Sequence, residues 1–209
     1  MENILDIYVS ECPANMARVS FDERPCQLID DVYTPLKMEA GKPERYDCEY
    51  KRKGSSCLLL AYDIDTGKRH AQVRKRRTKQ DFAEFFDWLE QKYAQVTTLL
   101  VVLDNLNTHT IGSFYEYLNL DRAAQLRKKI KFVYTPKHGS WLNMVEIEFS
   151  ALSRQCLNRR IGNIEELEKQ IMPWIEERNE KQIKISWNFT VQKARDQMES
   201  KYIKINHNL

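Results

Sequence analysis

The sequence predicts an α/β fold with five strands in one mixed sheet and helices packed against it. Three observations support this prediction: a short strand-like run at 17–21, an almost unbroken apolar run at 97–104, and an amphipathic segment between them. Short apolar runs bounded by turn residues are typical of buried strands, whereas apolar positions spaced by three and four residues are typical of helices. The alternation of the two patterns favours an α/β architecture.

Three strands are expected before residue 74. Residues 17–21 end on an aspartate with a proline shortly after it, which predicts a brief strand. The polar segment 30–56 contains several prolines and glycines and a basic run, a composition typical of a long loop. Residues 56–73 predict two strands joined in a hairpin at Thr66-Gly67.

Helices and strands alternate through the remainder of the chain. Thr78 and Asp81 have the spacing of a capping box, so a helix is expected to begin at Thr78. The run 97–104 suits a strand buried on both faces. The further expected elements are a helix over 112–129, a strand over 130–134 and a helix over 142–157. The resulting order is β-β-β-α-β-α-β-α.

One main domain with a helical appendage is expected. The 209 residues can bury one large core but leave little room for a second independent domain. We expect a linker or tail at 1–16, the main domain at 17–160, and an appendage at 161–209 that packs on the same domain. The appendage begins with a capping pattern at Asn163, and Pro173 is expected to kink its helix.

The composition excludes several classes of protein. No segment approaches the roughly 18 apolar residues of a membrane helix, and the first residues lack the pattern of a secretory signal, so a cytoplasmic location is expected. The 33 basic residues are nearly balanced by 30 acidic ones, and the net charge of +3 does not by itself indicate a nucleic-acid partner. The five cysteines lack zinc-binding spacing and are expected to be reduced: Cys12, Cys26, Cys48, Cys57 and Cys156.

Three acidic residues occupy special places in this pattern. Asp22 and Asp104 follow apolar strands, and Glu146 lies in the first turns of a helix after a Gly-Ser-Trp break. Hard divalent cations prefer oxygen ligands such as carboxylates. Two such ions about 3.5–4 Å apart stabilise both reacting oxygens of a phosphoryl displacement, which then needs no protein nucleophile. An aspartate after a strand is also often a simple turn or cap residue, so spacing alone leaves the function open.

Longer motifs surround these three acids. They read Phe-Asp-Glu-Arg-Pro at 21–25, Val-Val-Leu-Asp-Asn-Leu-Asn-Thr-His-Thr at 101–110, and Tyr-Thr-Pro-Lys-His-Gly-Ser-Trp-Leu-Asn-Met-Val-Glu at 134–146. In this order the chain resembles bacterial insertion-sequence transposases of the mariner superfamily, which are described as DDE endonucleases. The resemblance extends from about residue 17 to about residue 195.

The resemblance implies a fold, a reaction and a set of ligands. It implies a ribonuclease-H-like fold in which Asp22, Asp104 and Glu146 hold two Mg²⁺ ions, with Mn²⁺ as a substitute. The implied partners are transposon ends and target DNA, which a homodimer near the bacterial nucleoid would cleave and join by strand transfer. Members recognise their ends through an amino-terminal helix-turn-helix region, and too few residues precede Asp22 to form one. We therefore expect a catalytic domain whose recognition region is missing or supplied by a separate chain.

Two other functions fit the same three acids. A ribonuclease-H-like nuclease that only hydrolyses would share the carboxylates and would give no strand transfer. An inactive, domesticated DNA-binding relic is the non-enzymatic alternative, and the intact acids argue against it.

The third acid has a neighbour that must be distinguished from it. Glu146 and Glu148 are two residues apart on one predicted helix, so they point about 200° apart around its axis. Only one of them is expected to be a direct metal ligand, and apolar periodicity does not choose between them. The family pattern Leu-Asn-x-x-Glu selects Glu146 and leaves Glu148 as a supporting or surface residue.

Several further residues are candidates for DNA contact, and each also has a structural interpretation. A basic cluster can neutralise phosphates or protect a sheet edge from aggregation; it comprises Arg74, Lys75, Arg76, Arg77 and Lys79. Trp141 can stack on a displaced base or anchor the core, and the core is favoured. The remaining candidates can contact phosphate or hold loops in place through hydrogen bonds: Asn105, His109, Lys137 and His138.

Overall fold

The computed structural model describes residues 1–199 and contains a five-stranded mixed sheet. The strand order is β3-β2-β1-β4-β5, in which β1 is antiparallel to β2 and parallel to β4. At the two edges, β3 pairs antiparallel with β2 and β5 pairs parallel with β4. The strands are β1 Met16–Asp31, β2 Tyr50–Asp63, β3 Arg69–Arg74, β4 Thr98–Leu103 and β5 Ile130–Tyr134. This arrangement confirms the predicted α/β fold with one mixed five-stranded sheet flanked by helices.

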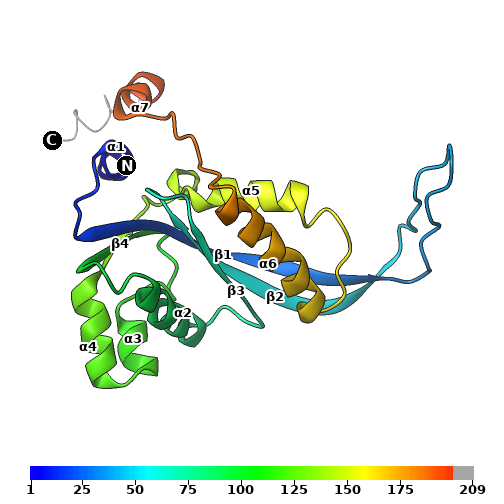
Figure 1. The fold of residues 1–209 in the computed structure, drawn as a ribbon, viewed down its shortest axis with the longest axis horizontal. Helices are drawn as coiled ribbons and strands as arrows, with labels where there is room; N and C mark the ends of the chain where they lie inside the picture. Colours follow the sequence, from blue (N-terminus) through cyan, green and yellow to red (C-terminus); the bar gives the residue numbers. More distant parts are fainter. Residues whose placement is uncertain (200–209) are drawn as a thin grey trace.

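Helices cover both faces of the sheet (Figure 1). Those on one face are α2 Lys79–Lys92, α3 Gly112–Tyr117 and α4 Leu120–Lys129, and those on the other are α5 Val145–Gln155 and α6 Ile164–Glu180. Successive residues of a strand point to opposite faces. On β1, Phe21 packs against the aromatic side chains of α2, so Asp22 points toward the face that α5 covers.

The central strand is longer than the sequence predicts. The expected strand 17–21 is part of the 16-residue strand β1, and Pro25 lies inside that strand rather than after it. β1 pairs with β4 only as far as Ser20, so one edge of β1 has no neighbouring strand from Phe21 onward. Proline lacks a backbone N–H and is tolerated at such an edge.

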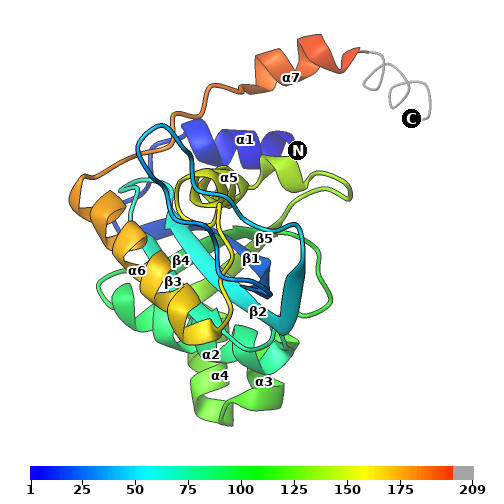
Figure 2. The ribbon, with the colours of Figure 1, turned by 90° about the vertical axis from the view of Figure 1, so that its right-hand side faces the viewer.

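The expected loop 30–56 is strand at its two ends, because β1 extends to Asp31 and β2 begins at Tyr50. Within it β1 and β2 continue as a two-stranded arm that projects beyond the helices (Figure 1, Figure 2). Residues 50–55 of β2 are all exposed, which shows that no helix covers this part of the arm. Residues 32–49 connect the two strands, and isolated bridges there join Leu36 to Arg45 and Glu39 to Lys42.

Several local predictions are confirmed. The hairpin between β2 and β3 turns at Gly67, whose φ of +77° is readily adopted only by glycine. Thr78 and Asp81 form the expected capping box at the start of α2. The side chain of Asn163 caps α6 by accepting a hydrogen bond from the amide of Glu166.

The helix expected over 112–129 is divided into α3 and α4. The backbone is extended at Leu118, and the side chain of Asn119 then caps α4 by accepting a hydrogen bond from the amide of Arg122. Apolar spacing continues across this break, so it did not reveal the interruption. The helix expected over 142–157 is preceded by a separate 3-10 turn, η1 Ser140–Leu142, and begins at α5.

The expected linker 1–16 contains a helix, α1 Glu2–Val9. Its Ile4 and Leu5 are buried, and α1 lies beside α7 Val191–Gln197 (Figure 1, Figure 2). Arg18 of β1 holds the end of α1, because it ion-pairs with Asp65 and donates hydrogen bonds to backbone carbonyls at that end. The segment is too short for its apolar spacing to predict packing.

Within residues 1–199, no helix combines the length and the apolar character that a membrane crossing requires. All five cysteines are free thiols, as the sequence predicts. Three of them, Cys26, Cys57 and Cys156, are buried in the two main apolar cores.

A buried ion cluster joins α5 and α6 to the edge strand β3. The carboxylate of Glu148, which is 1% exposed, accepts two hydrogen bonds from Arg69 at 2.8 and 2.9 Å and two from Arg178 at 3.1 Å. Burial alone would raise the pKa of Glu148, but the bonds from the two arginines outweigh it and hold the pKa below its usual range. Glu148 is therefore not a surface residue, and its charge stabilises the packing of the helices on the sheet.

We expect Glu148→Gln to lower the free energy of unfolding by about 3 kcal/mol, because it leaves the buried guanidinium of Arg69 and the partly buried one of Arg178 without a counter-charge. The contribution is also pH-dependent: since the folded pKa lies below the unfolded value of about 4.3, the stabilisation is present above that pH and is lost as the pH falls below it. Urea unfolding between pH 7 and pH 3 measures both effects.

Glu168→Gln is the matched control, because Glu168 is exposed on α6 and its side chain has no hydrogen-bond partner among residues 1–199. Its urea midpoint should equal that of the unmodified chain at every pH. Equal midpoints for Glu148→Gln and Glu168→Gln would show that the ion cluster does not stabilise the fold.

Candidate active site

Asp22 and Asp104 lie on neighbouring strands, as the sequence predicts. The parallel register pairs Val19 with Val101 and Ser20 with Val102, and the same offset leads to Asp22 and Asp104. Asp104 directly follows the last residue of β4, so the two aspartates meet where β4 ends and β1 continues without it. Asp22 therefore lies at the start of the part of β1 that β4 does not cover.

Glu146 belongs to α5, the helix that covers the face of the sheet toward which Asp22 points. It lies in the first turn of α5 and is exposed, and its amide donates to the carbonyl of Asn143 at 3.1 Å. Asn143 in turn contacts β1, so the start of α5 is held over the strand that carries Asp22. The three acids therefore come from β1, from the end of β4 and from the start of α5.

The pKa of Asp22 records the proximity of the other two acids. Burial raises this pKa to about 7, although a hydrogen bond of 2.7 Å from the amide of Glu23 opposes the shift. The negative charges of Asp104 and Glu146 contribute to this rise, each less than burial does. The pKa of Glu146 is raised by burial and by Asp104, while the charge of Arg24 lowers it. The three carboxyl groups thus share one electrostatic environment.

His109 keeps the second aspartate ionised. Its Nδ1 lies 2.7 Å from Asp104 Oδ1, and this hydrogen bond is the main reason that the pKa of Asp104 is lowered. Burial alone would lower the pKa of His109, but its contacts with Asp104 and Glu23 raise it to about 9. An imidazolium next to a carboxylate favours the charged form of both groups.

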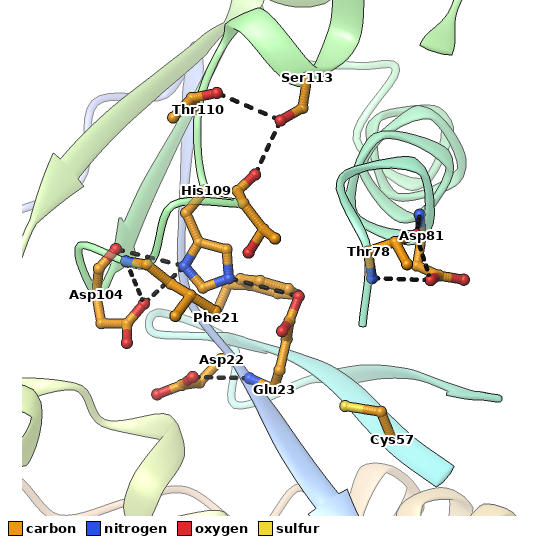
Figure 3. Close-up of polar contacts among 12 residues, drawn as sticks. Phe21, Asp22, Glu23, Cys57, Thr78, Asp81, Asp104, His109, Thr110 and Ser113 are labelled. Carbon is orange, nitrogen blue, oxygen red and sulfur yellow. Dashed lines mark hydrogen bonds and ion pairs between the residues drawn. The ribbon is translucent and has the colours of Figure 1, made fainter. Parts of the chain in front are cut away.

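His109 is buried on the α2 face, between the carboxylates of Asp104 and Glu23 (Figure 3). Its Nε2 lies 3.4 Å from Glu23 Oε1, and its ring stacks on Phe82 with centroids 5.0 Å apart. The side chain is 0% exposed, so of the two interpretations of His109 the structural hydrogen-bonding role fits its burial and contact with a phosphate does not. Its role in this structure is to orient Asp104 and to neutralise buried acids.

The predicted basic cluster is divided between ion pairs and exposed cations. Arg74 pairs with Glu84 at 2.9 Å, and Lys79 pairs with Glu116 at 2.7 Å. Arg77 is exposed and close enough to Asp104 for its charge to lower the pKa of that carboxyl group. The cluster members that are exposed and available to a phosphate are Lys75, Arg76 and Arg77.

A shallow hollow of about 270 Å³ opens beside Asp104. Asn105 lines it, and its side-chain amide donates to the carbonyl of Thr135 at 2.6 Å, which joins the ends of β4 and β5. Lys137 and His138 also line it and are exposed. These residues surround the acids on the side of β5.

Trp141 is not the core anchor that the sequence favours. It is 44% exposed and packs edge-on against Phe189, with ring centroids 5.3 Å apart. The turn η1 that carries it lies at the surface next to the start of α5, so the indole is accessible close to Glu146. Apolar character and position in a motif do not distinguish a buried indole from an exposed one.

Three residues of the site were not singled out from the sequence. Glu23 is buried on the face opposite Asp22, and neither of its carboxylate oxygens receives a hydrogen bond from residues 1–199. Arg24 shares the face of Asp22, and Asn143 donates to Asp22 Oδ2 at 3.3 Å. All three lie inside the motifs around Asp22 and Glu146. A strand buried on both faces gives no alternation that marks Glu23 and Arg24, and Asn143 lies between η1 and α5, outside any periodic element.

The three carboxylates provide the oxygen ligands that Mg²⁺ and Mn²⁺ prefer. Among residues 1–199, no three Asp, Glu, His or Cys side chains are already gathered at metal-binding distance. The exposed side chain of Glu146 can rotate toward Asp22, whereas Asp22 and Asp104 are held in place by hydrogen bonds. The donor set therefore fits a divalent cation, and Glu146 would have to move to complete it.

Several solved structures are similar to this chain at low sequence identity. A chain of the Mos1 mariner paired-end complex with Mn is 14% identical with a TM-score of 0.48, covering 84% of this chain and 53% of that one. The Mos1 transposase paired-end complex with left transposon end is 15% identical with a TM-score of 0.48, covering 87% of this chain and 59% of that one. The HTLV-2 integrase catalytic core domain in complex with magnesium is 15% identical with a TM-score of 0.38, covering 81% of this chain and 83% of that one. The chain thus spans between half and three fifths of the Mos1 chains.

No curated protein sequence matches this chain. The family model of the DDE superfamily endonucleases matches residues 17–168, which include Asp22, Asp104 and Glu146. That match spans more than half of the sequence, and the chain therefore belongs to the DDE superfamily endonucleases.

Proposed function

We propose that this chain is the catalytic domain of an insertion-sequence DNA transposase. Asp22, Asp104 and Glu146 form its metal site, which would serve both cleavage of a DNA strand and transfer of the freed 3′-hydroxyl to target DNA. The observation that carries the proposal is geometric: Asp22 and Asp104 lie on neighbouring parallel strands, and Asn143 holds the turn with Glu146 over the strand that carries Asp22. Three carboxylates brought together in this way repel one another unless a cation binds between them.

Each residue of the site has a task in this proposal. Asp22 and Asp104 would bind Mg²⁺ or Mn²⁺ from adjacent strands, and Glu146 would complete the ligand set. Two divalent cations held there would stabilise the attacking and leaving oxygens of an in-line phosphoryl displacement. His109 keeps Asp104 ionised and oriented, and the exposed cations from Lys75 to Arg77 would neutralise DNA phosphates beside it.

DNA ends and a second copy of the chain are the proposed partners. The Mos1 structures contain paired transposon ends, and the HTLV-2 integrase core has a dimeric form. Transposition requires two ends to be brought together, so we extend both features to this chain as part of the proposal. The runner-up function is a nuclease that only hydrolyses, and the same three carboxylates support it.

Replacing any of the three acids should abolish metal-dependent cleavage. We expect Asp22→Asn, Asp104→Asn and Glu146→Gln to lower the rate of plasmid nicking in Mn²⁺ by at least about a hundredfold, as loss of transition-state charge stabilisation does. Circular dichroism and DNA affinity should change little. A strand-transfer assay with precut ends distinguishes the two functions, since joined products support a transposase and hydrolysis without joining supports the nuclease.

Glu148→Gln is the informative comparison for Glu146→Gln. It should retain measurable activity when it is assayed below its unfolding temperature, because Glu148 pairs with two arginines and does not face the acids. Loss of activity in folded Glu148→Gln together with normal activity in Glu146→Gln would transfer the ligand role to Glu148.

Metal binding should strengthen as the pH rises through 7. The pKa of Asp22 is about 7, so below that pH a cation must displace a proton from its carboxyl group. We expect the Mn²⁺ affinity, measured by calorimetry in buffers of different ionisation enthalpy, to fall by nearly tenfold for each pH unit below 7. The Asp22→Asn variant should bind Mn²⁺ weakly, with an affinity that does not change with pH in this way. A Mn²⁺ affinity of the unmodified chain that is constant between pH 6 and pH 8 would contradict the assignment of Asp22 as a metal ligand.

DNA binding by this chain alone should be weak, insensitive to sequence and steeply dependent on salt. Phosphate contacts dominate such binding. The plot of log K against log salt has a negative slope, and each contact that is lost makes this slope shallower by about 0.9. We expect Arg77→Gln to show this shallower slope in fluorescence anisotropy titrations with two unrelated duplexes. Lys169→Gln, an exposed change on α6, should leave the slope unchanged. Tight binding to only one duplex would show that this chain recognises transposon ends itself.

A further inference from the structure

Asn143 is the residue that connects the first acid to the third. It is fully buried between η1 and α5, and its side-chain amide donates to the carbonyl of Phe21 at 2.8 Å and to Asp22 Oδ2 at 3.3 Å. The main-chain carbonyl of Asn143 accepts a hydrogen bond from the main-chain amide of Glu146. One side chain and one peptide group thus fix the distance between the strand with Asp22 and the helical turn with Glu146.

The orientation of the Asn143 amide is determined by its neighbours. Both groups near Nδ2 are acceptors, so an amide rotated by 180° would place its oxygen against a carbonyl and a carboxylate. The other end of the amide, Oδ1, is buried and receives no hydrogen bond from residues 1–199. A buried acceptor without a donor is unfavourable for folding, so stability alone does not explain an asparagine at this position.

The position of Asn143 follows from the end of the β1–β4 pairing. β4 pairs with β1 only as far as Ser20, and the Asn143 amide bonds to the main chain of the next residue, Phe21. The Asp22 carboxylate then has one donor on each oxygen, the Glu23 amide on Oδ1 and Asn143 on Oδ2. These two bonds fix the plane of the carboxylate, and each oxygen retains a lone pair for a cation.

A second contact holds the same turn without touching an acid. The hydroxyl of Tyr8 in α1 donates to the carbonyl of Leu142 at 2.7 Å, and Leu142 is itself buried. The start of α5 is therefore anchored twice, once by Tyr8 and once by Asn143. Only the second anchor contacts Asp22, which separates a role in folding from a role in the metal site.

We propose that Asn143 is a positioning residue of the metal site: its side chain orients the Asp22 carboxylate while its main chain holds the turn that carries Glu146. This inference rests on the proposed function, because it assumes that Asp22 and Glu146 bind the same cations. Removal of a group that orients a metal ligand typically weakens metal affinity by 10–100-fold. The loss expected for Asn143 lies in that range.

The test measures Mn²⁺ binding to the full chain by calorimetry and by the electron paramagnetic resonance signal of free Mn²⁺, at pH 8. Asn143→Ala should weaken the affinity by about 10–100-fold. Asn143→Asp, which keeps the size of the side chain but presents an acceptor to Phe21 and Asp22, should weaken it at least as much. Tyr8→Phe is the matched control, which should lower the unfolding temperature and leave Mn²⁺ affinity unchanged.

The outcomes distinguish this proposal from the function on which it rests. Equal Mn²⁺ affinities for the unmodified chain and Asn143→Ala overturn the positioning role. Affinities weakened to the same extent in Tyr8→Phe and Asn143→Ala also overturn it, because they show that only the anchoring of the turn matters. If Asp22→Asn binds Mn²⁺ as tightly as the unmodified chain, the metal site itself is wrong. If Asn143→Ala does not fold, the comparison is made with Asn143→Asp, whose unchanged affinity would equally reject the role.

Discussion

The structure depends on the burial of two adjacent carboxylates in its central strand. Asp22 and Glu23 follow each other on β1 and therefore point to opposite faces of the sheet, and both are less than 10% exposed. A buried carboxylate is unfavourable unless hydrogen bonds or opposite charges compensate it. On one face the Asn143 amide compensates Asp22, and on the other His109 compensates Glu23. The segments that follow β4 and precede α5 are placed by these two contacts.

The burial of these two carboxylates explains why Asp104 and Glu146 lie close to β1. His109 also bonds to Asp104, so the side chain that compensates Glu23 brings the end of β4 to β1. Asn143 brings the start of α5 to the same point. The acidic site is therefore assembled by residues that lie next to the three acids in the chain, and each motif contains both a ligand and the residue that places it.

Local signals predicted the parts of the fold that depend on local interactions. The capping box of Thr78, the apolar run of β4 and the turn at Gly67 are set by residues within a few positions of one another, and the structure contains all three. The three acids were found because their motifs resemble those of a known family, and apolar spacing alone did not choose between Glu146 and Glu148. The burial of Glu148 depends on Arg69, which is 79 positions away, so no local pattern could have predicted it. The burial of His109 likewise depends on Glu23 and Phe82, which come from distant strands and helices.

The β1–β2 arm gives this site a mechanical property. β1 is clamped between β2 and β4 up to Ser20, then continues for eleven residues with a strand on one side only. Its open edge is braced instead by the helical layer: the Ile29 amide donates to the carbonyl of Ile161, and Arg160 pairs with Asp31. Closer to Asp22, Arg24 donates to the carbonyl of Phe149 in α5. A force on the distant arm therefore reaches α5 and the segment between α5 and α6 before it reaches the first acid, so the packing of these segments insulates the acidic site from the arm.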